Sequence, residues 1–279
     1  MSYFNYNGHL FKEGTAIIGG SNRGLRYGDG LFETIKVKND AILFEAAHFS
    51  RLWNGMRVLE FDFPAYFTKD ILKEQIMQLA KKNNVERSAR IRLSVFRGDG
   101  NLYDPVNNDP DYIIQALPLA ADAGEWNING LVTGIFREVK KNGDILSSLK
   151  HNNYLPSIMA ARHAKKMKWD DTILLNSFGR IAETSIANIF IVRGEMISTP
   201  HLKEGCVAGI MRQALITYLQ ENNWKISERE ITEQDLLVAD EVFITNSIRN
   251  IKWVRQIGER VYTNIITQQI YNSFIPTIS

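Results

Sequence analysis

The sequence predicts a mixed α/β protein built from two domains, and three observations support this fold class. Segments with strand-like alternation and segments with helical spacing are mixed in both halves of the chain. A run of small and polar residues at 118–124 lies between the halves and has the composition of a linker. The length of 279 residues suits one large domain or two small ones, since a typical domain has roughly 100–200 residues.

These observations predict an N-terminal α/β domain at residues 1–118, a linker at 119–128 and a C-terminal α/β domain at 129–279. Ligand sites favour clefts between domains, so a functional site is expected in such a cleft.

The elements expected before the linker are strands at 31–37 and 41–44, helices at 50–59 and 67–82, and strands at 89–96 and 112–117. The first two strands read as a hairpin because the turn-forming residues Asn39 and Asp40 lie between them. The second helix is predicted from apolar residues at helical spacing, namely Phe67, Ile71, Leu72, Ile76 and Leu79. The elements expected after the linker are a strand at 131–136, a helix at 153–166, strands at 172–175 and 187–192, a helix at 209–220 and a strand at 242–245.

The composition is typical of a soluble globular protein. The 33 Lys+Arg and 31 Asp+Glu residues give a formal net charge of +2, which gives no reason to expect nucleic acid or an anionic membrane as a partner. The single cysteine, Cys206, excludes an intramolecular disulfide and a thiolate zinc site, and no metal is expected. The N-terminal segment lacks the basic and apolar regions of a signal peptide, and no apolar run approaches the roughly 20 residues that span a bilayer. A cytoplasmic location is therefore expected.

Lys150 is the candidate nucleophile. It lies in the segment SSLKHNNY just before a predicted helix, where an ordinary lysine would simply be solvated. A lysine whose pKa is lowered by burial or by neighbouring cations can instead form a Schiff base with a carbonyl compound.

Two further segments supply groups that complement such a lysine. Glu183 directly precedes a strongly apolar strand, where it is either a charged turn residue or a carboxylate that holds a cationic ring nitrogen. Gly209 opens a helix, and the free amides of a helix N-terminus bind phosphate. The polar run from Thr245 to Ser247 follows a strand and offers hydroxyls and amides to the same anion, or forms a polar turn. Together, a lysine, a carboxylate and an anion site meet the requirements of pyridoxal phosphate.

The same segments make the sequence resemble the class IV (fold type IV) pyridoxal-phosphate enzymes, which include branched-chain and D-amino acid aminotransferases and aminodeoxychorismate lyase. The resemblance runs in order through NRGLRYGDGLFET at 22–34, HFSRL at 48–52, RG at 97–98, the Lys150 and Glu183 segments, GI at 209–210 and TNS at 245–247. It covers nearly the whole chain. It implies a two-domain fold like that of D-amino acid aminotransferase, with the cofactor in the cleft between the domains.

The resemblance also implies which residues bind the cofactor. Lys150 would carry pyridoxal 5'-phosphate as a Schiff base and move protons. Glu183 would pair with the pyridine nitrogen, and Tyr154 would reach the phenolate oxygen. Arg51 would bind the phosphate with two parallel hydrogen bonds. The other residues implied for the phosphate site are Gly209, Ile210, Met211, Asn246 and Ser247.

Substrate contacts are implied for Phe32, as a pocket-lining aromatic residue, and for Arg97, as a partner of the substrate carboxylate. Met211 stands where the family often has a threonine, which leaves its backbone amide but no hydroxyl for the phosphate.

The function expected is that of an aminotransferase that exchanges an amino group between an amino acid, of branched-chain or D-amino acid type, and a 2-oxo acid. The alternative within the family is aminodeoxychorismate lyase, which releases 4-aminobenzoate and pyruvate. A non-catalytic cofactor-binding protein on the same scaffold is a third possibility, and the intact set of lysine, glutamate and arginine argues against it. Members of the family are commonly homodimers, so a homodimer is expected.

Overall fold

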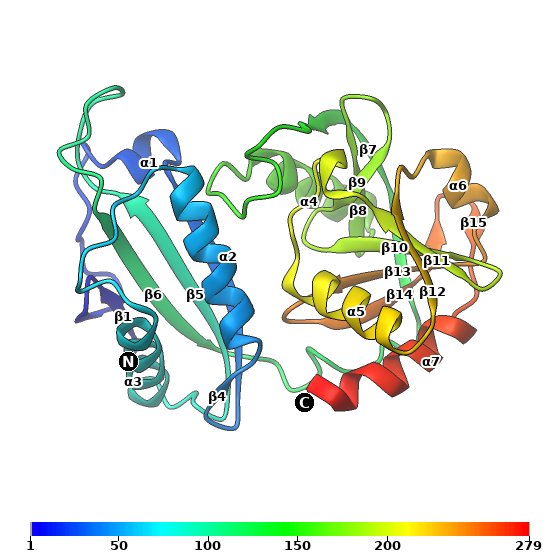
Figure 1. The fold of residues 1–279 in the computed structure, drawn as a ribbon, viewed down its shortest axis with the longest axis horizontal. Helices are drawn as coiled ribbons and strands as arrows, with labels where there is room; N and C mark the ends of the chain where they lie inside the picture. Colours follow the sequence, from blue (N-terminus) through cyan, green and yellow to red (C-terminus); the bar gives the residue numbers. More distant parts are fainter. Residues whose placement is uncertain (1, 279) are drawn as a thin grey trace. The chain divides into compact units, whose positions relative to one another are not determined.

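The computed structural model describes residues 2–278, which fold into two compact units. Unit 1 comprises Met1–Ala121 with Leu149–Asn153, and unit 2 comprises Asp122–Ser148 with Tyr154–Ser279 (Figure 1). Both units combine helices with a β-sheet, which confirms the predicted mixed α/β class. The division after Ala121 falls within the expected linker at 119–128. Residues 149–153 were expected in the second domain with the rest of 129–279, but they pack with unit 1.

Unit 1 contains a six-stranded antiparallel sheet with the strand order β2-β1-β6-β5-β3-β4. Its strands are β1 (Tyr3–Tyr6), β2 (His9–Lys12), β3 (Gly30–Lys38), β4 (Ala41–Ile42), β5 (Ser88–Arg97) and β6 (Pro110–Pro118). β4 pairs only with the last residues of β3, at Val37 and Lys38. The first half of β3 therefore has one edge that β4 does not cover.

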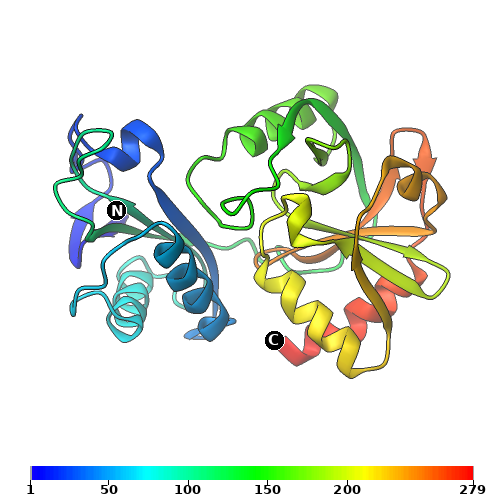
Figure 2. The same cartoon turned by 45° about the horizontal axis from the view of Figure 1, so that its top comes forward.

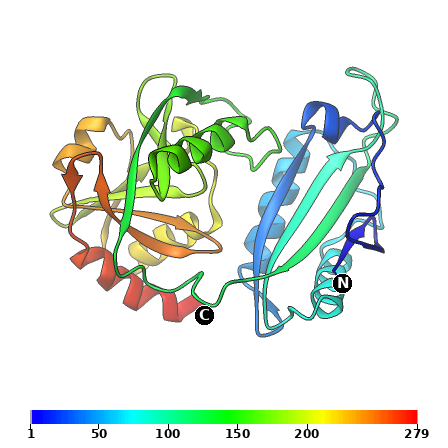
Figure 3. The same cartoon turned by 180° about the vertical axis from the view of Figure 1, so that it is seen from behind.

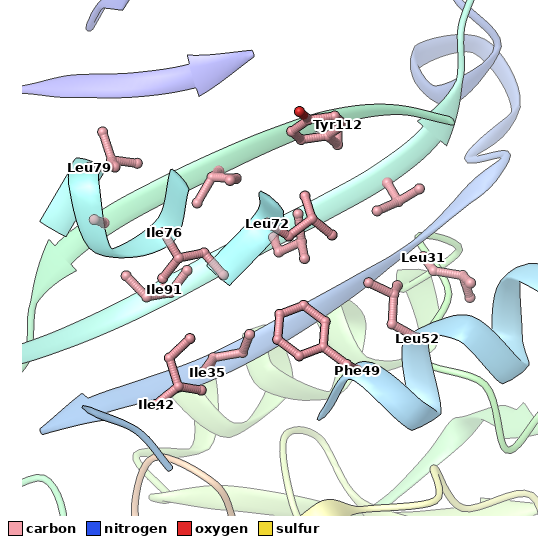
Figure 4. Close-up of a cluster of buried hydrophobic side chains, with 14 of the residues drawn as sticks. Leu31, Ile35, Ile42, Phe49, Leu52, Leu72, Ile76, Leu79, Ile91 and Tyr112 are labelled. Carbon is pink, nitrogen blue, oxygen red and sulfur yellow. The ribbon is translucent and has the colours of Figure 1, made fainter. Parts of the chain in front are cut away.

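Helices α2 (Glu45–Val58) and α3 (Lys69–Lys82) pack on one face of this sheet, and the short α1 (Arg23–Tyr27) lies near β5. Apolar side chains from α2, α3 and the covered face of the sheet form the core of unit 1, among them Ile35, Phe49 and Ile76 (Figure 4). Alternate residues of each strand point away from this core, because the side chains of a strand alternate between its two faces. The second face is thereby left for polar and functional residues.

Unit 2 contains nine strands, eight of them in the order β12-β11-β10-β13-β14-β7-β8-β9, with β15 paired to β14. The strands are β7 (Leu131–Lys141), β8 (Asp171–Asn176), β9 (Ile181–Thr184), β10 (Asn188–Arg193), β11 (Met196–Pro200), β12 (Lys225–Arg229), β13 (Glu241–Asn246), β14 (Asn250–Ile257) and β15 (Arg260–Val261). β9 also contacts β10, so the sheet curls back on itself (Figure 2). This curl brings the ends of β7, β9 and β10 into one region of unit 2.

Four α-helices pack on this sheet: α4 (Leu155–Met167), α5 (Ile210–Glu221), α6 (Glu233–Val238) and α7 (Ile265–Phe274). Two short 3₁₀ turns, η1 (Leu202–Glu204) and η2 (Ile275–Ile278), complete the unit. α4 packs against β7 and β8, whereas α5 and α7 both pack against β13 (Figure 3). Among the helices within residues 2–278, none has the length and apolar character needed to cross a membrane.

Candidate active site

The segment that carries Lys150 pairs with the open edge of β3 through an isolated β-bridge. The Phe32 amide donates to the Lys150 carbonyl at 2.9 Å, and the Asn152 amide donates to the Gly30 carbonyl at 2.9 Å. Leu31 and His151 form the antiparallel bridge between these two hydrogen bonds. The backbone at residues 150–152 is thus fixed by two hydrogen bonds to a strand of the core sheet, which is how unit 1 positions the half-buried side chain of Lys150.

The Lys150 amine lies over the aromatic ring of Phe32. This ring is buried, and Lys150 Nζ lies 4.5 Å from the ring centroid. The Arg92 guanidinium lies 3.9 Å from the same centroid and donates from Nε to Ser94 Oγ at 3.1 Å. A cation over a ring face is attracted by the ring quadrupole. The structure therefore brings together Lys150 and Phe32, and it adds Arg92, which the sequence had not identified.

A buried carboxylate, Glu33, joins β3 to α2. It accepts hydrogen bonds from Arg51 Nε at 2.7 Å, from Arg51 Nη2 at 2.5 Å and from His48 Nδ1 at 2.7 Å. Burial favours a neutral carboxyl, but the charge of Arg51 and the hydrogen bonds from His48 and Arg51 lower the pKa of Glu33 to about 2. The structure thus orients the Arg51 side chain within unit 1, and its expected contact with a phosphate stays a prediction.

Arg97 lies on the other face of β5 from Ser94 and Arg92. Its Nη1 donates to Asp29 at 2.7 Å and its Nε to Asn108 at 3.1 Å. Its Nη2 donates to the backbone carbonyls of Leu59 and Glu60, and the guanidinium stacks over the Phe61 ring. The structure therefore gives Arg97 a set of partners within unit 1 and does not bring it to Phe32 and Lys150. Its expected role in binding a substrate carboxylate stays a prediction.

The central carboxylate of unit 2 is Glu183 on β9, whose side chain is 5% exposed. Its Oε1 accepts a hydrogen bond from Lys141 Nζ at 2.7 Å. Its Oε2 accepts one from the Val207 amide at 2.9 Å. Each oxygen has lone pairs left over after these bonds, so the carboxylate can still accept a hydrogen bond from a cationic N–H group.

The N-terminus of α5 is the candidate phosphate site of unit 2. Gly209 precedes the helix, and within the described part of the chain no side chain caps the first turn and no acidic residue lies in it. The amides of Ile210 and Met211 are among those that an α-helix leaves without an intrahelical partner. A Cβ on Gly209 would lie 1.9 Å from Asn188 Oδ1, so only glycine allows this close approach. The geometry suits a phosphate at the helix N-terminus.

Asn188 connects this helix end to the polar run after β13. Its Nδ2 donates to the Val207 carbonyl at 2.8 Å, and in the sheet it pairs with Thr245. Asn246 Oδ1 accepts from the amides of residues 248 and 249, and Ser247 follows it half-buried in the same turn. Unit 2 therefore brings the polar run toward the same region as Gly209 through Asn188.

Three other candidate residues of unit 2 have well-defined surroundings. The Met211 side chain is buried in the apolar core, so the residue can offer only its amide to an anion. Tyr154 is the N-cap residue of α4 and is half-buried. Burial, together with the charge of Glu183, raises the pKa of the Cys206 thiol to about 12, which makes it a packing residue and not a nucleophile.

The residues of unit 2 fit pyridoxal phosphate in their chemistry. Glu183 is a buried carboxylate suited to a cationic ring nitrogen, and the N-terminus of α5 is suited to a phosphate. Within residues 2–278, the buried hydroxyl of Thr245 has no hydrogen-bond partner, which leaves one more polar group beside Asn188 for a ligand. The same range contains no group of three or more His, Cys, Asp or Glu side chains that could hold a metal ion.

We expect substitution of Gly209 by alanine to weaken pyridoxal phosphate binding by about tenfold or more. The new Cβ would clash with Asn188 Oδ1, and relieving such overpacking costs about 1–3 kcal/mol and displaces the amides of α5. Titration of the cofactor-free protein with pyridoxal phosphate, followed by absorbance, measures the effect. Gly20→Ala is the matched control, because nothing lies within 4 Å of a Cβ at Gly20. Equal affinities of the two variants would rule out this role for Gly209.

Sequence reasoning missed Lys141, Arg92 and Asn188. The alternation Arg90-Ile91-Arg92 in a predicted strand was a usable signal, since it places both arginines on the face away from the core. The contact between Lys141 and Glu183 carries no comparable sequence signal, because 42 positions separate the two residues.

Comparison with known proteins shows the family of the chain. The family model for amino-transferase class IV matches residues 30–257. A putative branched-chain-amino-acid aminotransferase from Methanocaldococcus jannaschii is 32% identical over 261 residues, which cover 92% of this chain and 88% of the relative. An aminodeoxychorismate lyase from Vibrio harveyi is 30% identical over 239 residues, which cover 85% of this chain and 86% of the relative.

Solved structures agree with the sequence relatives. The branched-chain aminotransferase from Thermoproteus uzoniensis with norvaline superposes with a TM-score of 0.88 at 26% identity, covering 99% of this chain and 94% of that one. A putative 4-amino-4-deoxychorismate lyase from Legionella pneumophila superposes with a TM-score of 0.83 at 26% identity, covering 92% of this chain and 94% of that one. The predicted two-domain aminotransferase fold is confirmed at this level.

Proposed function

The chain belongs to the class IV aminotransferase family, and from this premise we propose that it binds pyridoxal 5'-phosphate and exchanges an amino group between an amino acid and a 2-oxo acid. The observation that carries the proposal is the intact residue set on this family's scaffold. Lys150 is fixed on the edge of β3, Glu183 is buried on β9, and an uncapped helix N-terminus follows Gly209.

When bound, pyridoxal phosphate draws electron density from the substrate carbon that is bonded to nitrogen. Glu183 supports this by keeping negative charge beside the ring nitrogen, which favours the protonated ring. Lys150 Nζ would hold the cofactor in the resting protein. The same Nζ would serve as the base that moves the proton of the substrate α-carbon.

The phosphate would bind to the amides of Ile210 and Met211, with further donors from Asn246 and Ser247. Arg51 would add two parallel charge-assisted hydrogen bonds. Because Glu33 fixes the orientation of Arg51, the guanidinium needs little reordering to meet an anion. Tyr154 would reach the phenolate oxygen of the cofactor.

The substrate would lie beside Phe32. The Arg92 guanidinium contacts this ring. We therefore propose Arg92, in addition to Arg97, as a candidate for binding a substrate carboxylate. Arg97 already has partners on all three of its guanidinium nitrogens.

Aminodeoxychorismate lyase is the second candidate function, since a Vibrio harveyi relative of that name is 30% identical to this chain. The two reactions would use the same lysine and cofactor. A paired assay separates them. We expect amino transfer from an amino acid that requires an added 2-oxo acid, detected by chromatography of both products. Formation of 4-aminobenzoate from aminodeoxychorismate without an added oxo acid would instead establish the lyase. A colourless protein that takes up no pyridoxal phosphate would contradict both functions.

The homodimer and the cytoplasmic location remain proposals. The dimer is supported by an exposed apolar strip on α4, where Leu155 is 71% exposed and where Ile158 and Met159 are also exposed. Strips of this kind often mark protein interfaces.

A further inference from the structure

Glu183 has a cationic partner within the protein itself. The ammonium group of Lys141, at the end of β7, lies 2.7 Å from Glu183 Oε1, and the side chains of Lys141 and Glu183 are 10% and 5% exposed. Two arginines of neighbouring segments pair with other carboxylates, Arg180 with Glu204 and Arg212 with Glu228. Among the ion pairs within residues 2–278, Glu183 takes part in one, with Lys141.

The local backbone brings Lys141 to this position. Gly205 has a φ of 90° and lies against the end of β7, where a Cβ would be 2.1 Å from the Asn142 carbonyl oxygen and 3.4 Å from Lys141 Cβ. The loop after Gly205 then presents the Val207 amide to Glu183 Oε2. One carboxylate oxygen is thus oriented by a charge and the other by an amide, both from segments that pack directly on each other.

We propose that Lys141 is the counter-ion of Glu183 in the cofactor-free protein, and that the cationic ring of the cofactor shares this role once bound. The inference rests on the proposed function, because it assigns Glu183 to the ring nitrogen. It makes Lys141 a positioning residue, which pairs with the Glu183 carboxylate and orients it before the cofactor arrives.

The physical reason is the cost of a buried charge. A carboxylate in this position without a cation is strongly unfavourable, and removal of one partner of a buried ion pair leaves the other uncompensated. The protein must fold before it can bind the cofactor, so a counter-ion that belongs to the chain is needed at that stage. After binding, two cations share one carboxylate, and each contributes less than it would alone.

A double-mutant cycle tests the first half of the proposal. Lys141→Met, Glu183→Gln and the double variant are compared by chemical unfolding in the absence of cofactor. We expect Lys141→Met to lower the folding equilibrium constant by about a hundredfold or more, and Glu183→Gln to rescue most of this loss. Lys141→Arg should retain wild-type stability, and Lys140→Met, at the exposed neighbouring position, is the matched control. Additive effects of the two single substitutions would overturn the proposal.

Binding of pyridoxal phosphate tests the second half. If Lys141 contacted the anionic cofactor directly, its removal would take away a favourable contact. Lys141→Met would then bind pyridoxal phosphate more weakly than the wild type. If Lys141 instead competes with the cofactor ring for the Glu183 carboxylate, its removal should not weaken binding of the cofactor. We expect folded Lys141→Met to bind the cofactor at least as tightly as the wild type, and the cofactor to raise its unfolding temperature by more than that of the wild type.

Weaker binding by Lys141→Met, or an equal rise in unfolding temperature, would overturn this half. Failure of the wild type to bind pyridoxal phosphate would instead overturn the proposed function and, with it, the second half. The cycle on the cofactor-free protein would still decide the first half in that case.

Discussion

Substitution of Lys150 by alanine is expected to lower the rate of amino transfer by about a thousandfold or more. The variant loses both the amine that holds the cofactor and the group that moves the substrate proton, and proton transfer by a positioned side chain alone contributes about 10²–10⁴-fold. The fold should survive, because Lys150 is tied to β3 through its backbone carbonyl and not through its side chain. Single-turnover kinetics with an amino acid measures the loss.

Borohydride reduction gives a second readout for the same variant. In the wild type, reduction in the presence of pyridoxal phosphate should fix the cofactor on Lys150, as located by peptide mass mapping. Lys141 is the informative internal control, since it is a second lysine of the proposed site and is buried. Labelling of Lys141 in the wild type, or full labelling of Lys150→Ala, would show that Lys150 is not the reactive amine.

Substitution of Glu33 by alanine is expected to destabilise unit 1 by about 3–5 kcal/mol, the range for removing one partner of a buried ion pair. The variant leaves Arg51 and His48 facing each other around an empty position, and His48 Nε2 already lacks a partner among residues 2–278. Urea unfolding monitored by tryptophan fluorescence measures the loss. Glu45→Ala is a suitable control, because Glu45, on the helix α2 that also carries His48 and Arg51, pairs with half-exposed lysines.

The contribution of Glu33 to the stability of the folded protein should depend on pH. Its pKa is about 2 in the folded protein against an ordinary value of 4.5, a difference worth about 3 kcal/mol. Because the folded pKa is the lower one, the ionised group stabilises the fold fully above pH 4.5, and this stability is lost as the pH falls toward 2. The gap in stability between the wild type and Glu33→Gln should therefore shrink between pH 5 and pH 2. A gap that stays constant over that range would contradict the assignment.

The long elements of the fold could be predicted because their apolar residues show clear periodicity. The predicted helix at 67–82 corresponds to α3 at Lys69–Lys82, and the predicted strand at 89–96 corresponds to β5 at Ser88–Arg97. α2 begins at Glu45, ahead of the expected residue 50, because Glu45 and the alanines after it are good helix formers. The five-residue α1 was missed, since a single turn is too short to show a period.

The site could be predicted only as separate segments. The residue types and the glycine before α5 are visible in the sequence, and the structure shows Lys150 on a strand edge and Glu183 buried. The partners of these residues could not be predicted. The pair Lys141–Glu183 exists because β7, β8 and β9 lie side by side, and the pair Phe32–Lys150 because the lysine segment adds to β3. Both depend on strand pairing between distant parts of the chain, which local patterns do not encode.

The pairing of residues 149–153 with β3 has a consequence for any attempt to divide the protein. The chain passes between the units at three places, after residues 121, 148 and 153. A fragment that ends at residue 121 would therefore lack the segment that pairs with the edge of β3 and would expose the amide of Phe32 and the carbonyl of Gly30. Such an unpaired edge is a template for strands of other chains. Expressed alone, the first 121 residues should self-associate, and a peptide carrying residues 149–153 should suppress it.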